Sequence, residues 1–362
     1  MPNAIAAILP DSAEHALTHT LRGIPYSMPT CTIDPSIERK SISGFKFPLG
    51  VYPVEPMTPL IGYTAEFEPE ESAEDMGDWE AWPDQYVFDI VVPADRVEAL
   101  WHQLFAMMPG RVFPIIDYIG HDAYREIDPY MAYEPIGKEK VTNALRQYRP
   151  FFFEDGMVGF GAVSEDPFFY IFVDEHKIVT VRVEPEYRPR IEKLLEAFEI
   201  PPREDPAGAD AAAHEHRSIL VTSPDRPDLI NGDEIVERMR DSWRLVLNVD
   251  PDSNVDDEGE ELGITPWVCL ARYSTDQSPH DQYAQLVLTA DSLRRAEELS
   301  QDTVISKLNP DGDWFDVVVI SANRMLEDQA EDLLKKIPKS KSLTKNALAN
   351  ETLLAYLTLK PS

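Results

Sequence analysis

The most regular spacing of metal-ligand side chains lies in an acidic segment at positions 250–261. Oxygen-bearing side chains occupy its first, third, fifth, seventh, ninth and twelfth positions: Asp250, Asp252, Asn254, Asp256, Glu258 and Glu261. Calcium is a hard cation that takes several oxygen ligands, and this spacing is that of an EF-hand loop. The sixth position is Val255, where the EF-hand turn needs glycine, and a predicted strand rather than a helix precedes the segment. We therefore predict a calcium loop outside a true EF-hand, with a metal-free acidic hairpin loop as the alternative.

A second group of chemically active side chains lies in the loop at 117–128. Asp117, His121 and Asp122 could supply an acid–base pair or, together with a divalent metal, the catalytic groups of a hydrolase. Loops on rigid scaffolds often carry function. No diagnostic spacing of nucleophile and base is present here, so a surface loop packed by tyrosines is the alternative.

Histidines at short spacing occur twice. His15 and His19 lie four residues apart on a predicted helix and could share a metal, but the sequence shows no third ligand. The tripeptide His-Glu-His at 214–216 lies in the segment 201–216, which is rich in proline and alanine and has no apolar periodicity. We interpret this segment as a mobile linker, which is a poor place for a preorganised metal site.

Signatures of the common catalytic classes are absent from the sequence. It has no P-loop, no G-x-S-x-G, no H-E-x-x-H and no Cys–His zinc spacing. Gly156, Gly159 and Gly161 form a G-x-x-G-x-G pattern inside a predicted strand, where close backbone packing or a bulge explains them better than phosphate binding. We predict no cofactor apart from calcium, and the balance of these observations is against an enzyme.

The most strongly patterned stretch of the chain spans residues 148–202. Three short strands are predicted at 157–163, 168–173 and 179–183. The second of these runs is apolar on both faces, and side chains alternate along a strand, so we expect it to be covered on both sides. Apolar residues at helical spacing then predict a helix at 189–198.

Similar patterns predict the remaining elements of the chain. Further strands are predicted at 86–92, 111–118, 219–222, 244–249, 267–273, 283–289, 314–320 and 353–359. Further helices are predicted at 94–107, 138–148, 231–242, 292–305 and 324–337. The runs at 267–273 and 283–289 flank a polar loop and predict an antiparallel pair.

These elements predict an α+β protein of two domains. Each domain would have a mostly antiparallel or mixed sheet with helices packed on one face, in the style of a ferredoxin-like α/β sandwich. We expect an N-terminal domain at 1–200, whose proline-rich segment 24–83 wraps it as an extended arm. The linker at 201–216 would then lead to a C-terminal domain at 217–362.

The composition restricts the possible partners and the compartment. The chain of 362 residues has 65 Asp and Glu against 33 Lys and Arg, which gives a formal net charge of −32. Such a surface repels nucleic acids and anionic membranes and suits a basic protein partner, although a salty cytosol also favours acidic surfaces. Two distant cysteines, no secretory signal and no bilayer-length apolar run indicate a cytoplasmic protein without a membrane segment.

From these features we expect a soluble, non-catalytic interaction or regulatory protein with a strongly acidic surface. Inhibitors and immunity proteins that bind basic partners have this profile. One alternative is a metal-assisted hydrolase that uses the Asp and His residues of the loop at 117–128. The other alternative is a structural protein stabilised by calcium in the segment 250–261.

Overall fold

The computed structural model describes residues 30–70, 82–223, 225–226, 228–256, 258–275, 278–308 and 314–359. It divides the chain into two compact units. The larger unit comprises Met28–Ile119 and Asp128–Asn248, and the smaller unit includes Gly120–Ile127 and the chain from Val249. The expected domain boundaries at 200 and 217 are therefore wrong, because residues 201–248 belong to the larger unit.

The larger unit is built on a sheet of ten strands in the order β14-β8-β7-β10-β11-β12-β6-β4, with β5 paired to β6 and β9 paired to β7. Its strands are β4 (Gly62–Tyr63), β5 (Glu66–Glu68), β6 (Gln85–Val91), β7 (Arg111–Ile119), β8 (Ile127–Ala132), β9 (Ile136–Gly137), β10 (Val158–Glu165), β11 (Phe168–Val173), β12 (Val179–Val183) and β14 (Leu245–Leu247). The central pairs β7–β10, β10–β11, β11–β12 and β12–β6 are all antiparallel. The three strands predicted in the stretch 148–202 are thus confirmed as neighbours in one sheet.

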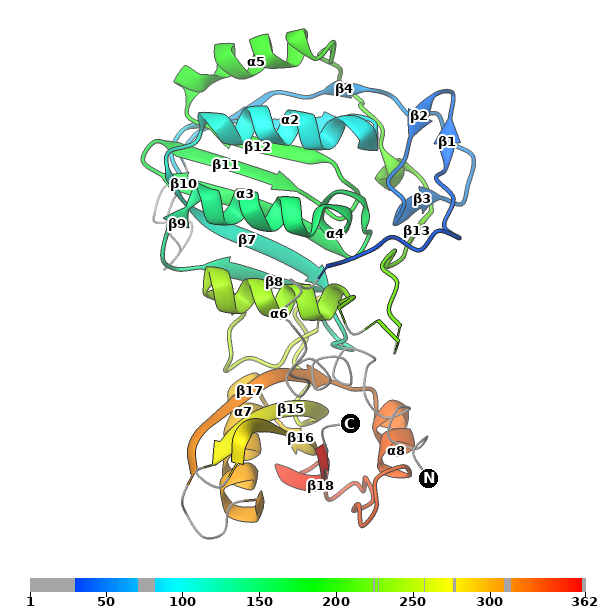
Figure 1. The fold of residues 1–362 in the computed structure, drawn as a ribbon, viewed down its shortest axis with the longest axis vertical. Coiled ribbons are helices and arrows are strands. Elements are labelled where there is room, and N and C mark those ends of the chain that lie inside the picture. Colours follow the sequence, from blue (N-terminus) through cyan, green and yellow to red (C-terminus); the bar gives the residue numbers. More distant parts are fainter. Residues whose placement is uncertain are drawn as a thin grey trace. The chain divides into compact units, whose positions relative to one another are not determined.

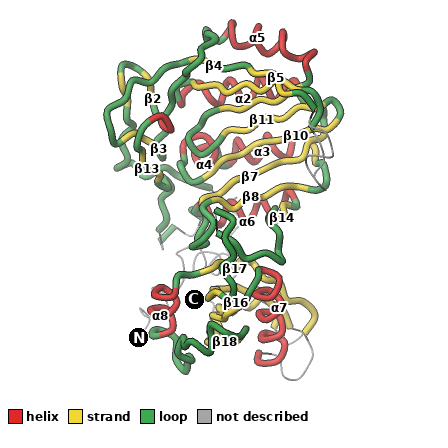
Figure 2. The backbone as a smooth tube through the Cα atoms, turned by 180° about the vertical axis from the view of Figure 1, so that it is seen from behind, coloured by secondary structure: helices red, strands yellow, loops and turns green. Residues whose placement is uncertain are grey.

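Helices cover one face of this sheet. They are α2 (Ala94–Met107), α3 (Lys138–Gln147), α4 (Arg149–Glu154) and α6 (Gly232–Trp243). A further helix, α5 (Arg188–Ala197), lies at the β4 edge of the sheet (Figure 1). Seen from behind, the strands lie in front of α2, α3, α4 and α6 (Figure 2). The core between the layers is aromatic: the rings of Trp101 and Phe160 are 4.8 Å apart, and Trp243 stacks on Phe152. All four side chains are fully buried, which fixes the helical layer on the sheet.

Two glycines of β10 make room for an aromatic ring on β11. A Cβ atom on Gly159 would lie 2.8 Å from Cζ of Phe172, and one on Gly161 would lie 2.6 Å from Cδ2 of the same ring. Phe172 points away from the helical layer, yet only 9% of it is exposed, because its ring lies on the two glycines. The glycine pattern in the sequence therefore serves packing within the sheet.

The proline-rich segment packs on the larger unit through short strands. They are β1 (Ser41–Ile42), β2 (Phe45–Lys46) and β3 (Val51–Pro53), and their partners include β13 (His214–His216). Phe47 and Val51 are fully buried in a small cluster of their own with Val91 and Ala209. Since β13 pairs with β3 in antiparallel register, the prediction of a mobile linker at 201–216 is wrong.

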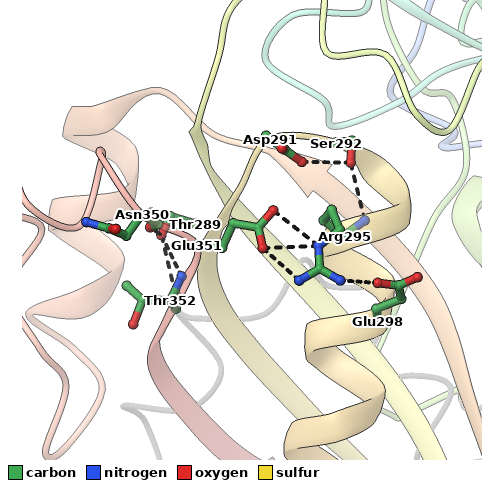
Figure 3. A network of polar contacts seen from close by, with 8 residues as sticks. All are labelled: Thr289, Asp291, Ser292, Arg295, Glu298, Asn350, Glu351 and Thr352. Atoms are coloured by element: carbon green, nitrogen blue, oxygen red, sulfur yellow. Dashed lines mark hydrogen bonds and ion pairs between the residues drawn. The ribbon is translucent and has the colours of Figure 1, made fainter.

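The smaller unit is a sheet of four antiparallel strands in the order β17-β15-β16-β18. Its elements are β15 (Thr265–Thr275), β16 (Ser278–Ala290), α7 (Leu293–Thr303), the π-helical turn Val304–Leu308, β17 (Trp314–Arg324), α8 (Glu327–Leu334) and β18 (Thr352–Leu359). The predicted antiparallel pair β15–β16 is confirmed. Figure 3 shows how Arg295 of α7 binds Glu351, at 2.7 Å, and Glu298, which ties α7 to the start of β18.

The α+β class predicted from the sequence is confirmed in both units. The ferredoxin-like arrangement stays a prediction. In the described part of the chain, no helix is long and apolar enough to cross a membrane.

Candidate metal centre

Three histidines of the larger unit converge on one point. His176 lies in the tight turn between β11 and β12, whereas His214 and His216 lie on β13. Because side chains alternate along a strand, His214 and His216 project from the same face of β13 and Glu215 projects from the other. One ring nitrogen from each histidine lies within 4.8 Å of the other two. All three side chains are half-buried.

Each of these imidazoles is held by a hydrogen bond at Nδ1. His214 Nδ1 lies 2.8 Å from the carbonyl oxygen of Ala212, and His216 Nδ1 lies 2.7 Å from that of Gly156. His176 Nδ1 lies 3.2 Å from a carboxylate oxygen of Asp174. Carbonyl and carboxylate oxygens only accept hydrogen bonds, so the proton of each neutral ring is on Nδ1 and the Nε2 lone pair is left over. Partners of this kind orient the histidine ligands of metal sites.

The remaining nitrogens face each other at close range. His176 Nε2 and His214 Nε2 are 3.0 Å apart. With both protons on Nδ1, this contact would join two lone pairs, so it needs a shared proton or a cation between the rings. Zinc–nitrogen bonds of about 2.0–2.1 Å in a tetrahedron place neighbouring nitrogens about 3.3 Å apart, close to what is found here.

The pKa shifts of the histidines agree with this geometry. Burial lowers the pKa of His176, but the hydrogen bond and charge of Asp174, with the charge of Glu175, outweigh burial and raise it above its ordinary value. Burial lowers the pKa of His216, and the neighbouring His176 and His214 lower it further. The carboxylates of Asp174 and Glu175 thus favour positive charge at His176, and burial disfavours it at His216.

The turn that carries His176 is fixed by its first residue. Asp174 Oδ1 accepts the backbone N–H of Ile178 at 2.7 Å, and its carbonyl accepts that of Lys177 at 3.1 Å. Lys177 takes a positive φ of 67°, which closes the turn. Asp174 thus both shapes the turn and orients the ring of His176.

The strand that carries the other two histidines depends on a close contact between backbones. A Cβ atom on Gly50 would lie 2.0 Å from the backbone nitrogen of Gly156, so only glycine fits. Gly50 also accepts the backbone N–H of Arg217 at 2.8 Å. On the outer face of β13, Tyr52 donates its hydroxyl to Glu215 at 2.6 Å. This packing holds β13 against the turn at Gly156.

The ligand chemistry indicates a borderline or soft cation. Imidazole nitrogen suits zinc, copper, nickel and iron, whereas calcium and magnesium prefer oxygen. The carboxylates of Asp174 and Glu175 lie beside Nδ1 of His176, at 3.2 and 3.4 Å, and their negative charge favours any cation at the cluster.

The structure separates the three residues predicted in the loop at 117–128. Asp117 lies on β7 in the larger unit, but His121 and Asp122 belong to the smaller unit. Asp122 is buried and binds the guanidinium of Arg324 with both oxygens, at 2.8 and 3.1 Å from Nε. The carboxylate of Asp122 thus has a structural partner, and the proposed catalytic group is not assembled in either unit.

Asp117 has a perturbed pKa for a different reason. Burial and, to a lesser extent, the charge of Glu175 together raise the pKa of its carboxyl group to about 6. The folded protein therefore holds this proton more tightly than the unfolded chain, whose aspartates titrate near 4. Stability is lost as the pH rises from about 4 through 6.

Substitution of this carboxyl is therefore expected to stabilise the protein. Asp117→Asn should raise the free energy of unfolding by about 1–3 kcal/mol at pH 7 and leave it unchanged at pH 3.5. Urea unfolding at both pH values measures this difference. An equal effect at the two pH values would contradict the assignment to ionisation.

The predicted calcium segment has other contacts. The buried side-chain amide of Asn254 donates to the Thr265 hydroxyl at 3.1 Å, and its Oδ1 accepts a hydrogen bond from Arg324 at 3.2 Å. Asp252 forms an ion pair with Arg294. Within 250–256 and 258–261, no three Asp or Glu carboxylates have oxygens that all lie within 4.8 Å of one another. Calcium binding here stays a prediction that these contacts do not support.

Sequence reasoning missed the histidine cluster. The spacing of His214 and His216 is a usable signal, since residues two apart on a strand share a face. The lack of apolar periodicity around them predicts a linker instead. His176 gave no signal, because only the paired strands bring it to β13. The other histidine pair, His15 and His19, lies outside the described residues.

Comparisons with protein-family models, with curated proteins and with solved structures gave no match.

Proposed function

We propose that the larger unit binds one transition-metal ion, such as Zn²⁺, through Nε2 of His176, His214 and His216. The observation that carries this proposal is the 3.0 Å contact between two Nε2 atoms whose rings both have Nδ1 hydrogen-bonded to an oxygen acceptor. A bound cation removes the repulsion of these lone pairs and uses all three rings in the orientation they already have.

Three protein ligands leave one position of a tetrahedral zinc site open. Structural zinc sites usually have four protein ligands, whereas catalytic sites have three and a water, whose pKa the metal lowers to about 7. We therefore propose a metal-dependent enzyme of the hydrolase class, with the three histidines in place of the residues at 117–128.

The test is a titration of chelator-treated protein with Zn²⁺, and with Ca²⁺ for comparison. A metal at 100 times its dissociation constant stabilises a protein by about 2.7 kcal/mol, or roughly 5–10 °C for a unit of this size. We expect Zn²⁺ to raise the melting temperature by this amount when free Zn²⁺ is at about 100 times its dissociation constant, and Ca²⁺ to leave it unchanged. A shift with Ca²⁺ alone would favour the segment at 250–261 instead.

A second proposed function is binding of a basic protein partner. It is supported by the net charge of −32. Arg39, Arg182 and Arg324 already form ion pairs within the chain, so their positive charge is partly neutralised there. Binding that weakens steeply with added salt would support it. The cytoplasm is the compartment we propose, since Cys31 and Cys269 are both free thiols.

A further inference from the structure

The segment between α4 and β10 touches both halves of the metal centre. Gly156 accepts a hydrogen bond from His216, and Val158 accepts one from the ammonium of Lys177, the residue after His176. Val158 also opens β10, which is anchored in the centre of the sheet. The turn at 155–158 is therefore the physical link between the histidine of the β11–β12 turn and those of β13.

Asp155 controls the orientation of this link. Its Oδ1 accepts the N–H of Met157 at 2.9 Å. That N–H and the carbonyl of Gly156 belong to one planar peptide unit, so a hydrogen bond to the N–H fixes the direction of the carbonyl oxygen. This oxygen is the acceptor for Nδ1 of His216.

The second oxygen of Asp155 fixes the chain that leaves β13. Oδ2 accepts the backbone N–H of Ile219 at 2.9 Å and the hydroxyl of Ser218 at 3.1 Å. One carboxylate thus holds the acceptor of His216 and the strand that carries His216.

The carboxylate is kept in place by burial and by a buried cation. Asp155 is completely buried and Lys177 is 2% exposed. Burial raises the pKa of Asp155, whereas its hydrogen bonds to Ile219 and Met157 and the charge of Lys177 lower it. Burial lowers the pKa of Lys177 to about 8, and the charge of Asp155 opposes this shift. Neither group has an exposed surface for another role.

We propose that Asp155 is a positioning residue of the histidine metal centre, acting through the Gly156–Met157 peptide and the backbone of Ile219. This inference rests on the proposed function for its metal readout, but it also makes a prediction for the metal-free protein. With the carboxylate in place, His216 has one tautomer, protonated on Nδ1. Without it, the peptide is free to turn and the tautomers mix.

Asp155→Asn tests the proposal, because the amide is isosteric but has only one oxygen. It can accept from Met157 or from Ile219, and its NH2 group then faces the other backbone N–H. Loss of an outer hydrogen-bond partner typically weakens metal binding 10–100-fold, and we expect about tenfold weaker Zn²⁺ binding. The matched control is Glu234→Gln, which alters a buried carboxylate that caps α6 and touches no histidine of the cluster. This control should leave the zinc affinity unchanged.

A second readout does not need a metal. Nitrogen-15 NMR of the imidazole rings should show the Nδ1-protonated form of His216 in the wild type and in Glu234→Gln, and a mixture in Asp155→Asn. If no variant or wild type binds zinc but the tautomer changes, the proposed function fails and the positioning role stands. If Asp155→Asn keeps both the zinc affinity and the tautomer, the positioning role is overturned.

Should Asp155→Asn not fold, Ser218→Ala gives a milder test. It removes only one donor to the same carboxylate. We expect a smaller loss of zinc affinity, about twofold to fivefold, in the same direction. An affinity equal to that of the wild type would count against the proposal.

Discussion

Asp122→Ala is expected to destabilise the smaller unit by about 3–5 kcal/mol, the usual cost of removing one partner of a buried ion pair. The side chains of Asp122 and Arg324 are 0% and 5% exposed. Asp122 also accepts the backbone N–H of Arg324 at 2.8 Å. Without the carboxylate, the guanidinium stays buried with an uncompensated charge, and the segment 120–127 loses its anchor to β17.

Urea unfolding with a probe in the smaller unit measures this loss. The matched control is Asp252→Ala, which removes an exposed partner of Arg294. Exposed pairs contribute about 0–1 kcal/mol, so the control should change stability little. Equal effects of the two substitutions would show that burial of the Asp122–Arg324 pair is not what makes it important.

The second large effect is expected at the metal centre. His214→Ala removes one of three ligands, and we expect zinc affinity to fall by more than about 100-fold, since outer partners alone account for 10–100-fold. The same titration that measures zinc binding to the wild type measures this loss.

His102→Ala is the matched control for this substitution. His102 lies on α2 in the same unit, and its side chain is 36% exposed. Its ring lies beside Glu98 and not at the histidine cluster. We expect it to bind zinc like the wild type. Equal weakening by His102→Ala would mean that zinc is held elsewhere or that the loss reflects unfolding.

Local pattern was sufficient for most of the elements. The helix predicted at 94–107 has those bounds as α2, and the apolar run at 168–173 is the inner strand β11. Both depend on periodicity within one segment, which burial of one face or of two faces imposes directly. The runs at 267–273 and 283–289 were likewise paired correctly because a short connection favours an antiparallel neighbour.

Contacts between distant segments leave no local pattern in the sequence. The segment 201–216 has no periodicity of its own, because β13 is three residues long and gains its order from β3. The glycines at 50 and 156 read as ordinary turn residues, and only the fold shows that their backbones touch. The strand predicted at 219–222 is likewise absent, and Leu220 there makes only an isolated bridge to Ile33.

The catalytic group predicted at 117–128 is not formed, for the same physical reason. Asp117, His121 and Asp122 are close in sequence, but the chain passes from one compact unit to the other between them. His176 and His214 are 38 residues apart and come into contact only through the turn at 155–158 and the β3–β13 pair. Neighbourhood in sequence was thus a poor guide to neighbourhood in the folded chain.

The most direct measurement is X-ray absorption at the zinc edge of protein loaded with one equivalent of Zn²⁺. We expect three imidazole ligands with zinc–nitrogen distances of about 2.0–2.1 Å and one further light ligand from solvent. The imidazole scattering should fall to two rings in His214→Ala. A spectrum with oxygen or sulfur ligands only, or protein that retains no zinc after desalting, would contradict the assignment of a metal centre to these histidines.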